Sequence, residues 1–224
     1  MEAIKNNSQQ ISAIICTDAQ AEKYSSLLPD KTFITDYSNL KKISSLKTPQ
    51  EVLAVLNKPV HPVMNFKGID TLVLALEDIR DPGNMGTIIR LADWFGVKDI
   101  ICSQQCVDCF NPKSVQATMG SIFRVRIHYL DLPLYLNQLD SKVAKIYGTA
   151  LDGENIYTQK LQQASIVIMG NESTGLSEDI RKKLNARLLI PHASTNSDFS
   201  ESLNVSVATA LVLGEFRRQQ FYSK

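Results

Sequence analysis

The chain has 224 residues, of which 44% are hydrophobic, enough for one large domain and a small second one. Its formal net charge of +1 provides no broad basic field, so charge neither supports nor excludes a nucleic-acid partner. No apolar run approaches the roughly 18 residues that a membrane span requires, and the opening MEAIKNNSQQ lacks the regions of a secretory signal. We therefore expect a cytoplasmic protein.

Residues 1–58 predict a small α/β domain. Apolar strands are expected at Ile11–Cys16, at Thr32–Ile34 and within residues 48–56, with a polar helix at 19–28 and a further element at 39–43. Pro59 and Pro62 then forbid a regular helix. Residues 59–67 are therefore predicted to link this domain to a second one at 68–224.

The second domain alternates between strand and helix patterns. This alternation predicts a parallel sheet flanked by helices, which binds ligands beyond the carboxyl ends of its strands. The strands are expected at 71–76, 99–102, 124–127, 144–149, 165–169 and 187–190, and the helices at 84–95, 112–119, 177–184 and from Leu203 onward.

The spacing of the glycines and of the cysteines limits which classes of ligand the chain could bind. No two glycines are separated by a single residue, which disfavours a dinucleotide-dependent oxidoreductase and a methyltransferase of the common Rossmann type. Cys16 stands alone, and Cys102, Cys106 and Cys109 have no nearby His or fourth thiol to complete a zinc set. We expect reduced, structural cysteines and no metal.

Four segments carry a resemblance to a known family. They are DIRDPGNMGTIIRLADWFG, NPKSVQATMGSIFRV, IVIMGNESTGLS and SLNVSVATALVLGEFRR, in this order between about residues 69 and 220. They resemble successive motifs of the SpoU (TrmH-type) branch of the SPOUT superfamily, the RNA ribose 2'-O-methyltransferases. The resemblance implies a C-terminal trefoil knot, S-adenosylmethionine bound in that knot, a homodimer, and rRNA or tRNA as the substrate. A non-catalytic RNA-binding relative remains the alternative.

Arg90 is the first candidate catalytic residue. Methyl transfer to a ribose hydroxyl needs a hydroxyl stripped of its proton and a fixed charge near the developing alkoxide. The Arg90 side chain should lean back across Gly86 towards the start of its helix, although a surface arginine is the alternative. The resemblance gives the matching arginine a role in activating the 2'-hydroxyl. Because a guanidinium stays protonated, we favour phosphate positioning and alkoxide stabilisation over a base role.

Four further residues are candidates for catalysis. By resemblance Asn84 belongs to the first catalytic motif and Glu172 helps to organise the site, although an N-cap role would also explain Asn84. Ser202 and Asn204 flank the start of the last helix, where they could orient substrate or cofactor. N-capping is the alternative for Ser202.

Three residues are expected at the cofactor. The resemblance implies that Gly170 presents backbone to S-adenosylmethionine and that Ile190 and Leu203 contact its adenine and surroundings, which is compatible with a place in the core. Residues 192–201 form a longer loop than the family usually has, and this loop lacks a glycine. We therefore expect the cofactor-binding loop to have a different conformation from the one usual in the family.

Two regions bear on RNA binding and assembly. Residues 1–58 resemble the later part of a ribosomal-protein-L30e-like substrate-binding domain, and we expect a truncated form of it. The last helix has an apolar face that could be core or dimer seam, and Gly214 within it suggests that another backbone packs close. That face consists of Val205, Ala208, Leu211 and Val212.

Overall fold

A computed structural model describes residues 11–62, 71–139, 144–193 and 202–222 of the chain. The chain splits into two compact units, Met1–His61 and Pro62–Lys224, and the division falls within the predicted linker. Among the described helices, none is both long enough and apolar enough to cross a membrane.

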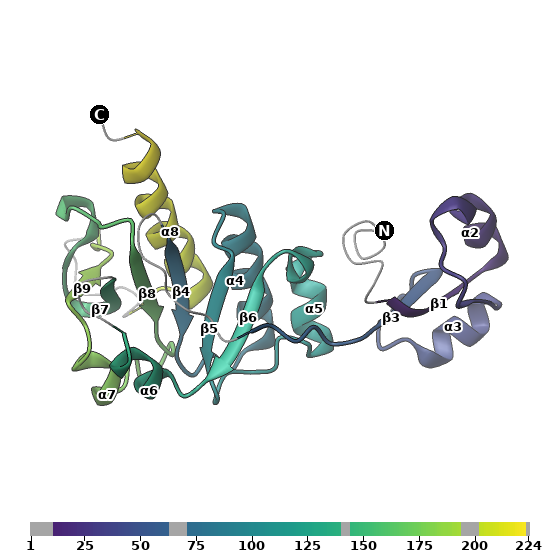
Figure 1. The fold of residues 1–224 in the computed structure, drawn as a ribbon, viewed down its shortest axis with the longest axis horizontal. Helices are drawn as coiled ribbons and strands as arrows, with labels where there is room; N and C mark the ends of the chain where they lie inside the picture. The colour runs from purple at the N-terminus through teal and green to yellow at the C-terminus, as the bar shows by residue number, and fades with distance from the viewer. Residues whose placement is uncertain (1–10, 63–70, 140–143, 194–201, 223–224) are drawn as a thin grey trace. The chain divides into compact units, whose positions relative to one another are not determined.

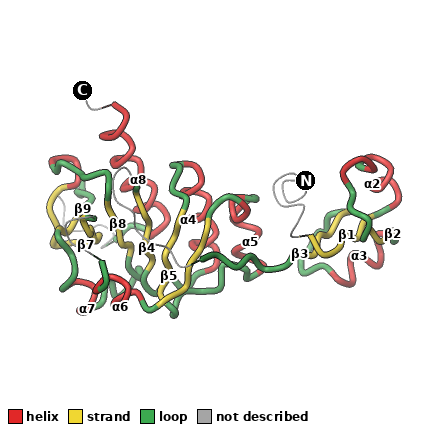
Figure 2. The backbone as a smooth tube through the Cα atoms, viewed as in Figure 1, coloured by secondary structure: helices red, strands yellow, loops and turns green. Residues whose placement is uncertain are grey.

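The smaller unit contains a three-stranded sheet in the order β2-β1-β3, with β1 and β3 labelled in Figure 1 and all three strands labelled in Figure 2. Strand β1 (Ile11–Cys16) pairs in parallel with β2 (Thr32–Ile34) and antiparallel with β3 (Val52–Leu56), as the sequence predicts. Helices α2 (Asp18–Lys23) and α3 (Tyr37–Ile43) accompany the sheet.

The predicted helix at 19–28 is wrong in its second half. Helix α2 ends at Lys23, and only a single 3-10 turn at Ser25–Leu27 follows. Two adjacent serines favour turns over helix interiors, and Pro29 restricts the residue before it to extended conformations.

The larger unit is built on a six-stranded sheet in the order β6-β5-β4-β8-β7-β9. Every neighbouring pair runs parallel, which confirms the predicted parallel sheet. The order reverses between β4 and β8, so the carboxyl ends of these strands border the crevice in which open sheets bind ligands. The strands are β4 (Leu72–Leu76), β5 (Asp99–Ser103), β6 (Arg126–Leu130), β7 (Lys145–Asn155), β8 (Ser165–Met169) and β9 (Ala186–Leu189).

Helices cover both faces of this sheet (Figures 1 and 2). Successive residues of a strand point to opposite faces of the sheet, and in β4 both faces are covered. Leu74 packs in the core cluster that contains residues of α4 and α8, whereas Val73 packs in the cluster that contains residues of α6 and α7. The helices are α4 (Pro82–Trp94), α5 (Pro112–Thr118), α6 (Leu132–Asn137), α7 (Glu178–Arg181) and α8 (Val205–Tyr222).

Several predicted boundaries differ from the structure. Helix α6 was not predicted: it has only six residues, is capped by Asp131, and buries Leu132 and Leu136 on one face. Strand β7 continues to Asn155 because its second half pairs with β9 after an irregularity, with Glu154 opposite Leu188. Strand β6 begins two residues later than predicted, after the 3-10 turn Ser121–Phe123.

Candidate functional site

Asn84 joins three segments that are far apart in the chain. Its Nδ2 donates a hydrogen bond to Glu172 Oε1 at 2.6 Å, and its Oδ1 accepts one from Asn204 Nδ2 at 3.0 Å. Glu172 follows β8, Asn84 lies in the first turn of α4 after β4, and Asn204 immediately precedes α8. The structure thus brings three of the five predicted catalytic residues into one hydrogen-bonded cluster at the reversal of strand order.

The N-cap interpretation of Asn84 is wrong. Helix α4 begins earlier than expected, and Asp81 caps it by accepting a hydrogen bond from the Asn84 backbone N–H at 2.7 Å. The sequence places Pro82 at the first helical position, where its missing N–H costs nothing. Because Asp81 satisfies the helix end, the Asn84 amide is available to the other two segments.

Asn204 fixes the orientation of this cluster. Its Oδ1 accepts hydrogen bonds from the N–H of Ser206 at 3.0 Å and from the Ser206 hydroxyl at 2.6 Å, as an N-cap does. This leaves Nδ2 to donate to Asn84, and Asn84 Nδ2 to donate to Glu172. Two amides in series therefore connect the positive end of α8 to the carboxylate of Glu172.

Asn171, to which the sequence analysis assigned no role, holds the turn that carries Glu172. Its Oδ1 accepts hydrogen bonds from the N–H groups of Ser173 and Thr174, and its Nδ2 donates to the carbonyl of Asp78 at 2.9 Å. Asp78 has a φ of 56°, a left-handed conformation that is uncommon for residues other than glycine. Asn171 therefore ties the turn after β8 to a strained loop after β4.

The loop after β4 is also held from the β5 side. Ser103 Oγ accepts a hydrogen bond from the Asp78 N–H at 3.0 Å, and Cys106 Sγ accepts one from the Ile79 N–H at 3.3 Å. A hydrogen bond from the Cys102 thiol lowers the pKa of Cys106 against the effect of burial, and the Ile79 N–H adds to this lowering. These contacts position the backbone that leads into Asp81 and Asn84.

Arg90 lies on the exposed side of α4. Among the residues that the structure describes, none forms a hydrogen bond or ion pair with Arg90. Gly86, across which the Arg90 side chain was expected to lean, faces α5. A Cβ on Gly86 would lie 2.4 Å from the carbonyl oxygen of Ser114 and 2.5 Å from Ala117 Cβ, so this glycine lets α5 pack closely on α4.

The predicted cofactor residues follow the ends of their strands. Gly170 comes directly after β8 and Ile190 directly after β9, where Ile190 packs partly buried against the main core. A Cβ on Gly170 would lie 2.6 Å from the carbonyl carbon of Gly175, so the close approach is made by its own turn. Leu203 is 49% exposed and is not a core residue.

Ser202 is exposed, and the N-cap of α8 is Asn204 instead of Ser202. The long loop predicted at 192–201 lies mostly outside the described residues, which end at Ala193 and resume at Ser202. The four cysteines are buried and form no disulfide. Within the described ranges no cluster of three potential metal ligands exists, and the expectation of no metal stays a prediction.

Three comparisons place this geometry among known proteins. The model of the SpoU rRNA Methylase family matches residues 71–214. The 23S rRNA (guanosine(2553)-2'-O)-methyltransferase RlmP of Bacillus subtilis is 32% identical over 176 residues, covering 78% of this chain and 68% of that protein. RlmB of Acinetobacter baylyi, a 23S rRNA (guanosine-2'-O-)-methyltransferase, is 29% identical over 194 residues, covering 81% and 76%. The AdoMet-bound rRNA methyltransferase of Sinorhizobium meliloti superimposes with a TM-score of 0.85 at 25% identity, covering 98% of this chain and 85% of that one.

Proposed function

Because this chain belongs to the SpoU rRNA methylase family, we infer that it transfers a methyl group from S-adenosylmethionine to a ribose 2'-hydroxyl of RNA. The observation that carries this inference is the cluster of Asn84, Glu172 and Asn204, which joins three separate motifs at the carboxyl edge of the sheet. We propose rRNA or tRNA as this RNA; the two relatives RlmP and RlmB carry names that specify 23S rRNA.

The residues around the cluster suit the cofactor. Gly170 and Ile190 offer backbone N–H and carbonyl groups at the carboxyl ends of β8 and β9, and the exposed apolar side chain of Leu203 lies next to Asn204. Backbone donors and an apolar wall suit an adenosine moiety, and we assign its binding to these three residues. When bound, S-adenosylmethionine supplies an electrophilic methyl group on a sulfonium.

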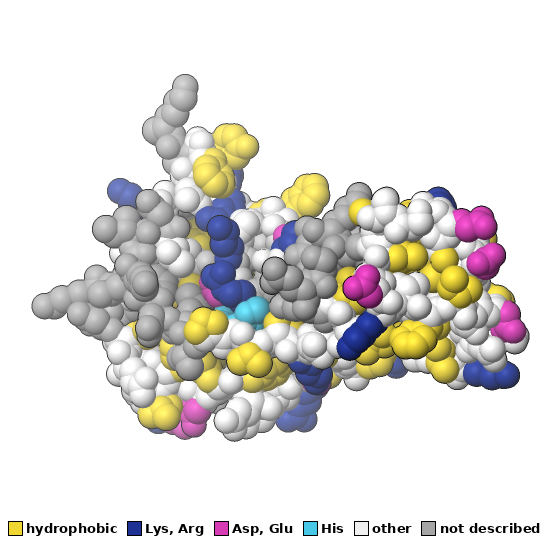
Figure 3. Space-filling view, turned by 45° about the vertical axis from the view of Figure 1, so that its right-hand side comes forward, with side chains coloured by type: hydrophobic (Ala, Val, Ile, Leu, Met, Phe, Trp, Pro, Cys, Tyr) yellow, Lys and Arg dark blue, Asp and Glu magenta, His cyan; other side chains and the backbone are white. Residues whose placement is uncertain are grey.

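The remaining residues act on the RNA. Arg90 positions a phosphate next to the reacting ribose and stabilises negative charge that develops on the 2'-oxygen, because its guanidinium is unpaired within the described chain. Glu172, held by Asn84, and the exposed hydroxyl of Ser202 orient the ribose. A row of Lys and Arg side chains crosses the face of the larger unit that Figure 3 shows, and this local positive region suits phosphates despite the net charge of +1.

A second copy of the chain completes the assembly. Val207 and Leu211 are spaced by four residues, so they lie on one face of α8, where they are 49% and 39% exposed. Leu203, which precedes this helix, is 49% exposed. Val205 and Val212 instead point into the core. An isologous contact between two such faces would cover the exposed stripe, and this supports the homodimer.

Three finer features belong to the same proposal. We expect the larger unit to contain a C-terminal trefoil knot that holds the cofactor, and the smaller unit to serve as an L30e-like RNA-binding domain. The order β2-β1-β3, with one parallel and one antiparallel pair, is compatible with such a domain. The cytoplasmic location stays a prediction.

Single-turnover methylation of bulk RNA with tritiated S-adenosylmethionine tests the proposal. Arg90→Ala should lose roughly 3 kcal/mol of transition-state stabilisation, more than a hundredfold in rate, with cofactor affinity unchanged within about threefold. Arg90→Lys should fail as well, because an ammonium lacks the forked donor geometry. The phosphodiester bond on the 3' side of each labelled ribose should resist alkaline hydrolysis, because a 2'-O-methyl group removes the internal nucleophile. Methyl groups found on bases would refute transfer to ribose. Full activity in Arg90→Ala would refute the role of Arg90. Cofactor binding without methyl transfer would indicate a non-catalytic relative.

A further inference from the structure

A carboxylate at the end of β4 holds the far end of the turn that carries Glu172. Glu77 follows β4 directly, and its backbone N–H donates to the carbonyl of Met169 at 2.9 Å, which continues the pairing of β4 with β8. Its Oε2 accepts a hydrogen bond from the Ser177 N–H at 2.9 Å, and its Oε1 accepts one from the Ser177 hydroxyl at 2.5 Å. Glu77 therefore joins the end of β4 to the residue at which the turn after β8 meets α7.

The turn between β8 and α7 is closed by its own backbone. Asn171 and Gly175 exchange two hydrogen bonds, of 3.2 and 2.9 Å, and Glu172 lies at the tip between them. Gly175 has a φ of 67°, the left-handed conformation that lets the tip close this tightly. A turn closed in this way moves as one body, so the contacts at its two ends determine where Glu172 points.

Two consecutive residues after β4 hold these two ends. The carbonyl of Asp78 accepts a hydrogen bond from Asn171 at the start of the turn, and the carboxylate of Glu77 accepts two from Ser177 at its end. One contact alone would let the turn rotate about it, whereas two contacts at opposite ends fix its direction. Buried Leu176 also anchors the turn, but an apolar contact is non-directional and fixes depth without fixing orientation.

We propose that Glu77 is a positioning residue for methyl transfer, which acts through Ser177 to set the direction in which the turn presents Glu172 to Asn84 and to the ribose. The proposal rests on RNA methylation as the function and adds to it a residue that acts on the geometry of the site. Glu77 is half-buried and Ser177 is exposed, so water can satisfy both groups when the contact is lost. Its loss should therefore be felt in the rate, which depends steeply on small misplacements, more than in stability.

A helix cap is the alternative purpose of the same contact. The Ser177 hydroxyl also accepts a hydrogen bond from the Ile180 N–H at 3.4 Å, as the N-cap of α7, and a carboxylate beside a helix start is favourable. If Glu77 served only this helix of four residues, its removal would lower Tm and leave the rate of methyl transfer unchanged well below Tm. The two purposes therefore differ in what they predict for the rate.

Two substitutions of Glu77 separate the contact from the charge. Glu77→Ala removes both acceptors, whereas in Glu77→Gln the amide oxygen can still accept from the Ser177 N–H and the amide nitrogen can donate to the Ser177 hydroxyl. In single-turnover methylation of bulk RNA with saturating tritiated S-adenosylmethionine, Glu77→Ala should be about tenfold slower than the wild type. Glu77→Gln should retain most of the rate. Cofactor affinity should be unchanged in both, because Gly170 is held by β8 and by the contact of Asn171 with Asp78.

Asp131→Ala is the matched control. Asp131 is a carboxylate of the same unit that accepts a hydrogen bond from the Leu134 N–H at 2.9 Å, and it follows β6, which lies two places from β4 in the sheet. Its removal takes away a comparable exposed contact without touching the turn that carries Glu172. This variant should methylate RNA at the wild-type rate.

Amide hydrogen exchange gives a readout that does not depend on activity. The Ser177 N–H should exchange about tenfold faster in Glu77→Ala, because it loses a hydrogen bond to a charged group, and at close to the wild-type rate in Glu77→Gln. The double variant Glu77→Ala, Ser177→Ala should methylate RNA as slowly as Glu77→Ala alone, since both substitutions remove one contact.

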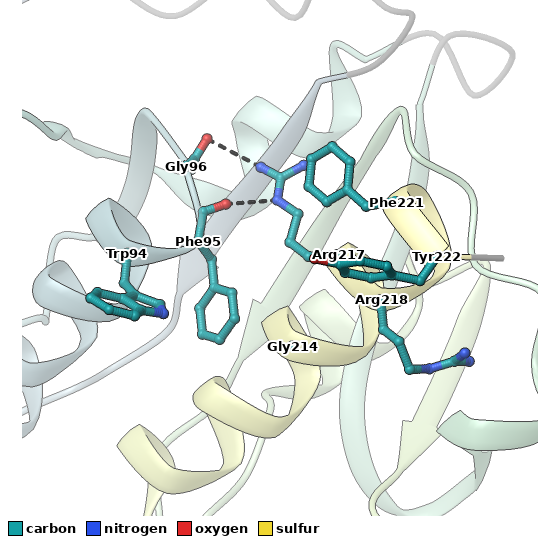
Figure 4. A pocket seen from close by; sticks show the side chains of 8 residues that line it. All are labelled: Trp94, Phe95, Gly96, Gly214, Arg217, Arg218, Phe221 and Tyr222. Atoms are coloured by element: carbon teal, nitrogen blue, oxygen red, sulfur yellow. Dashed lines mark hydrogen bonds between the residues drawn. The ribbon is translucent and has the colours of Figure 1, made fainter.

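The Glu77 variants leave the proposed contact between two copies untouched. The pocket in Figure 4 continues the exposed face of α8, and we assign it to that contact; the aromatic side chains around it are those of Trp94, Phe221 and Tyr222. Outside its own helix, Gly214 in this pocket has the Phe95 ring as its nearest neighbour in the described chain, 3.8 Å from where a Cβ would lie. Within one copy no other described backbone packs against Gly214, contrary to the expectation from the sequence. Sedimentation should therefore show the same assembly for the wild type and for both variants of Glu77.

Three outcomes overturn the positioning role. Glu77→Ala that methylates at the wild-type rate leaves Glu77 as a helix cap, with the methyltransferase function intact. Glu77→Gln as slow as Glu77→Ala assigns the effect to the charge of Glu77 and not to its contact with Ser177. A slow Glu77→Ala that sediments as a monomer, beside a dimeric wild type, assigns the effect to assembly. Failure of the wild type to bind S-adenosylmethionine or to methylate RNA instead refutes the proposed function itself, and the positioning role with it.

Discussion

The link between Asn84 and Glu172 can be tested by exchanging their functional groups. In Asn84→Asp the Nδ2 donor becomes a carboxylate oxygen that faces Glu172 across a contact of 2.6 Å. The variant loses a hydrogen bond to a charged group, which contributes about 1.5–3 kcal/mol, and gains repulsion between like charges. Because both side chains are partly exposed, we expect a loss of about 3 kcal/mol in the free energy of unfolding.

The exchange is completed by Glu172→Gln. Alone it should cost less than about 1 kcal/mol, because Asn84 Nδ2 can still donate to the oxygen of the new amide. In the double variant the glutamine introduced at position 172 donates to the carboxylate introduced at position 84, so a charge-assisted bond forms again with its polarity reversed. The double variant should therefore be more stable than the sum of the two single effects by about 1.5 kcal/mol.

Both residues belong to the larger of the two compact units, and calorimetry can resolve the unfolding of that unit from the unfolding of the smaller one. Asn111→Asp is the matched control: Asn111 caps α5 in the same unit, and Asp is an equally good N-cap. Strict additivity of Asn84→Asp and Glu172→Gln would refute the contact. Methyl transfer should stay low in the double variant, since the negative charge has moved from residue 172 to residue 84.

Two other predictions concern assembly and pH. Leu211→Arg should convert the dimer into a monomer in sedimentation at micromolar concentration, because it places two like charges in the contact between the two α8 helices. The control Leu134→Arg, on α6, should leave the dimer intact. A monomeric wild type would contradict the homodimer. Burial would raise the pKa of Asp99, but hydrogen bonds from Arg126 and His128 outweigh it and hold that pKa below its ordinary value. Asp99 therefore contributes stability above about pH 4 that is lost as the pH falls through its pKa. Asp99→Asn should lower Tm at neutral pH and flatten the acid limb of a Tm-against-pH profile, and an unchanged acid limb would remove Asp99 from this role.

Most of the strands could be predicted from the chain itself. Buried parallel strands are short, continuous apolar runs, and Leu72–Leu76 and Ser165–Met169 meet that pattern without help from distant residues. The alternation of such runs with helical patterns was enough to predict a parallel sheet flanked by helices. Helix ends were less predictable, since Asp81 and Asn84 are both good caps and only the chain geometry selects Asp81.

The tertiary structure decided what the polar residues do. Asn84 is separated by 88 residues from Glu172 and by 120 from Asn204, and no local pattern specifies a hydrogen bond over such distances. Only the strand order, with β8 beside β4, brings the turns together, and the caps of α4 and α8 then determine which amide atom faces which. Local periodicity records which face of an element is apolar, whereas the contacts of a polar side chain depend on which elements become neighbours.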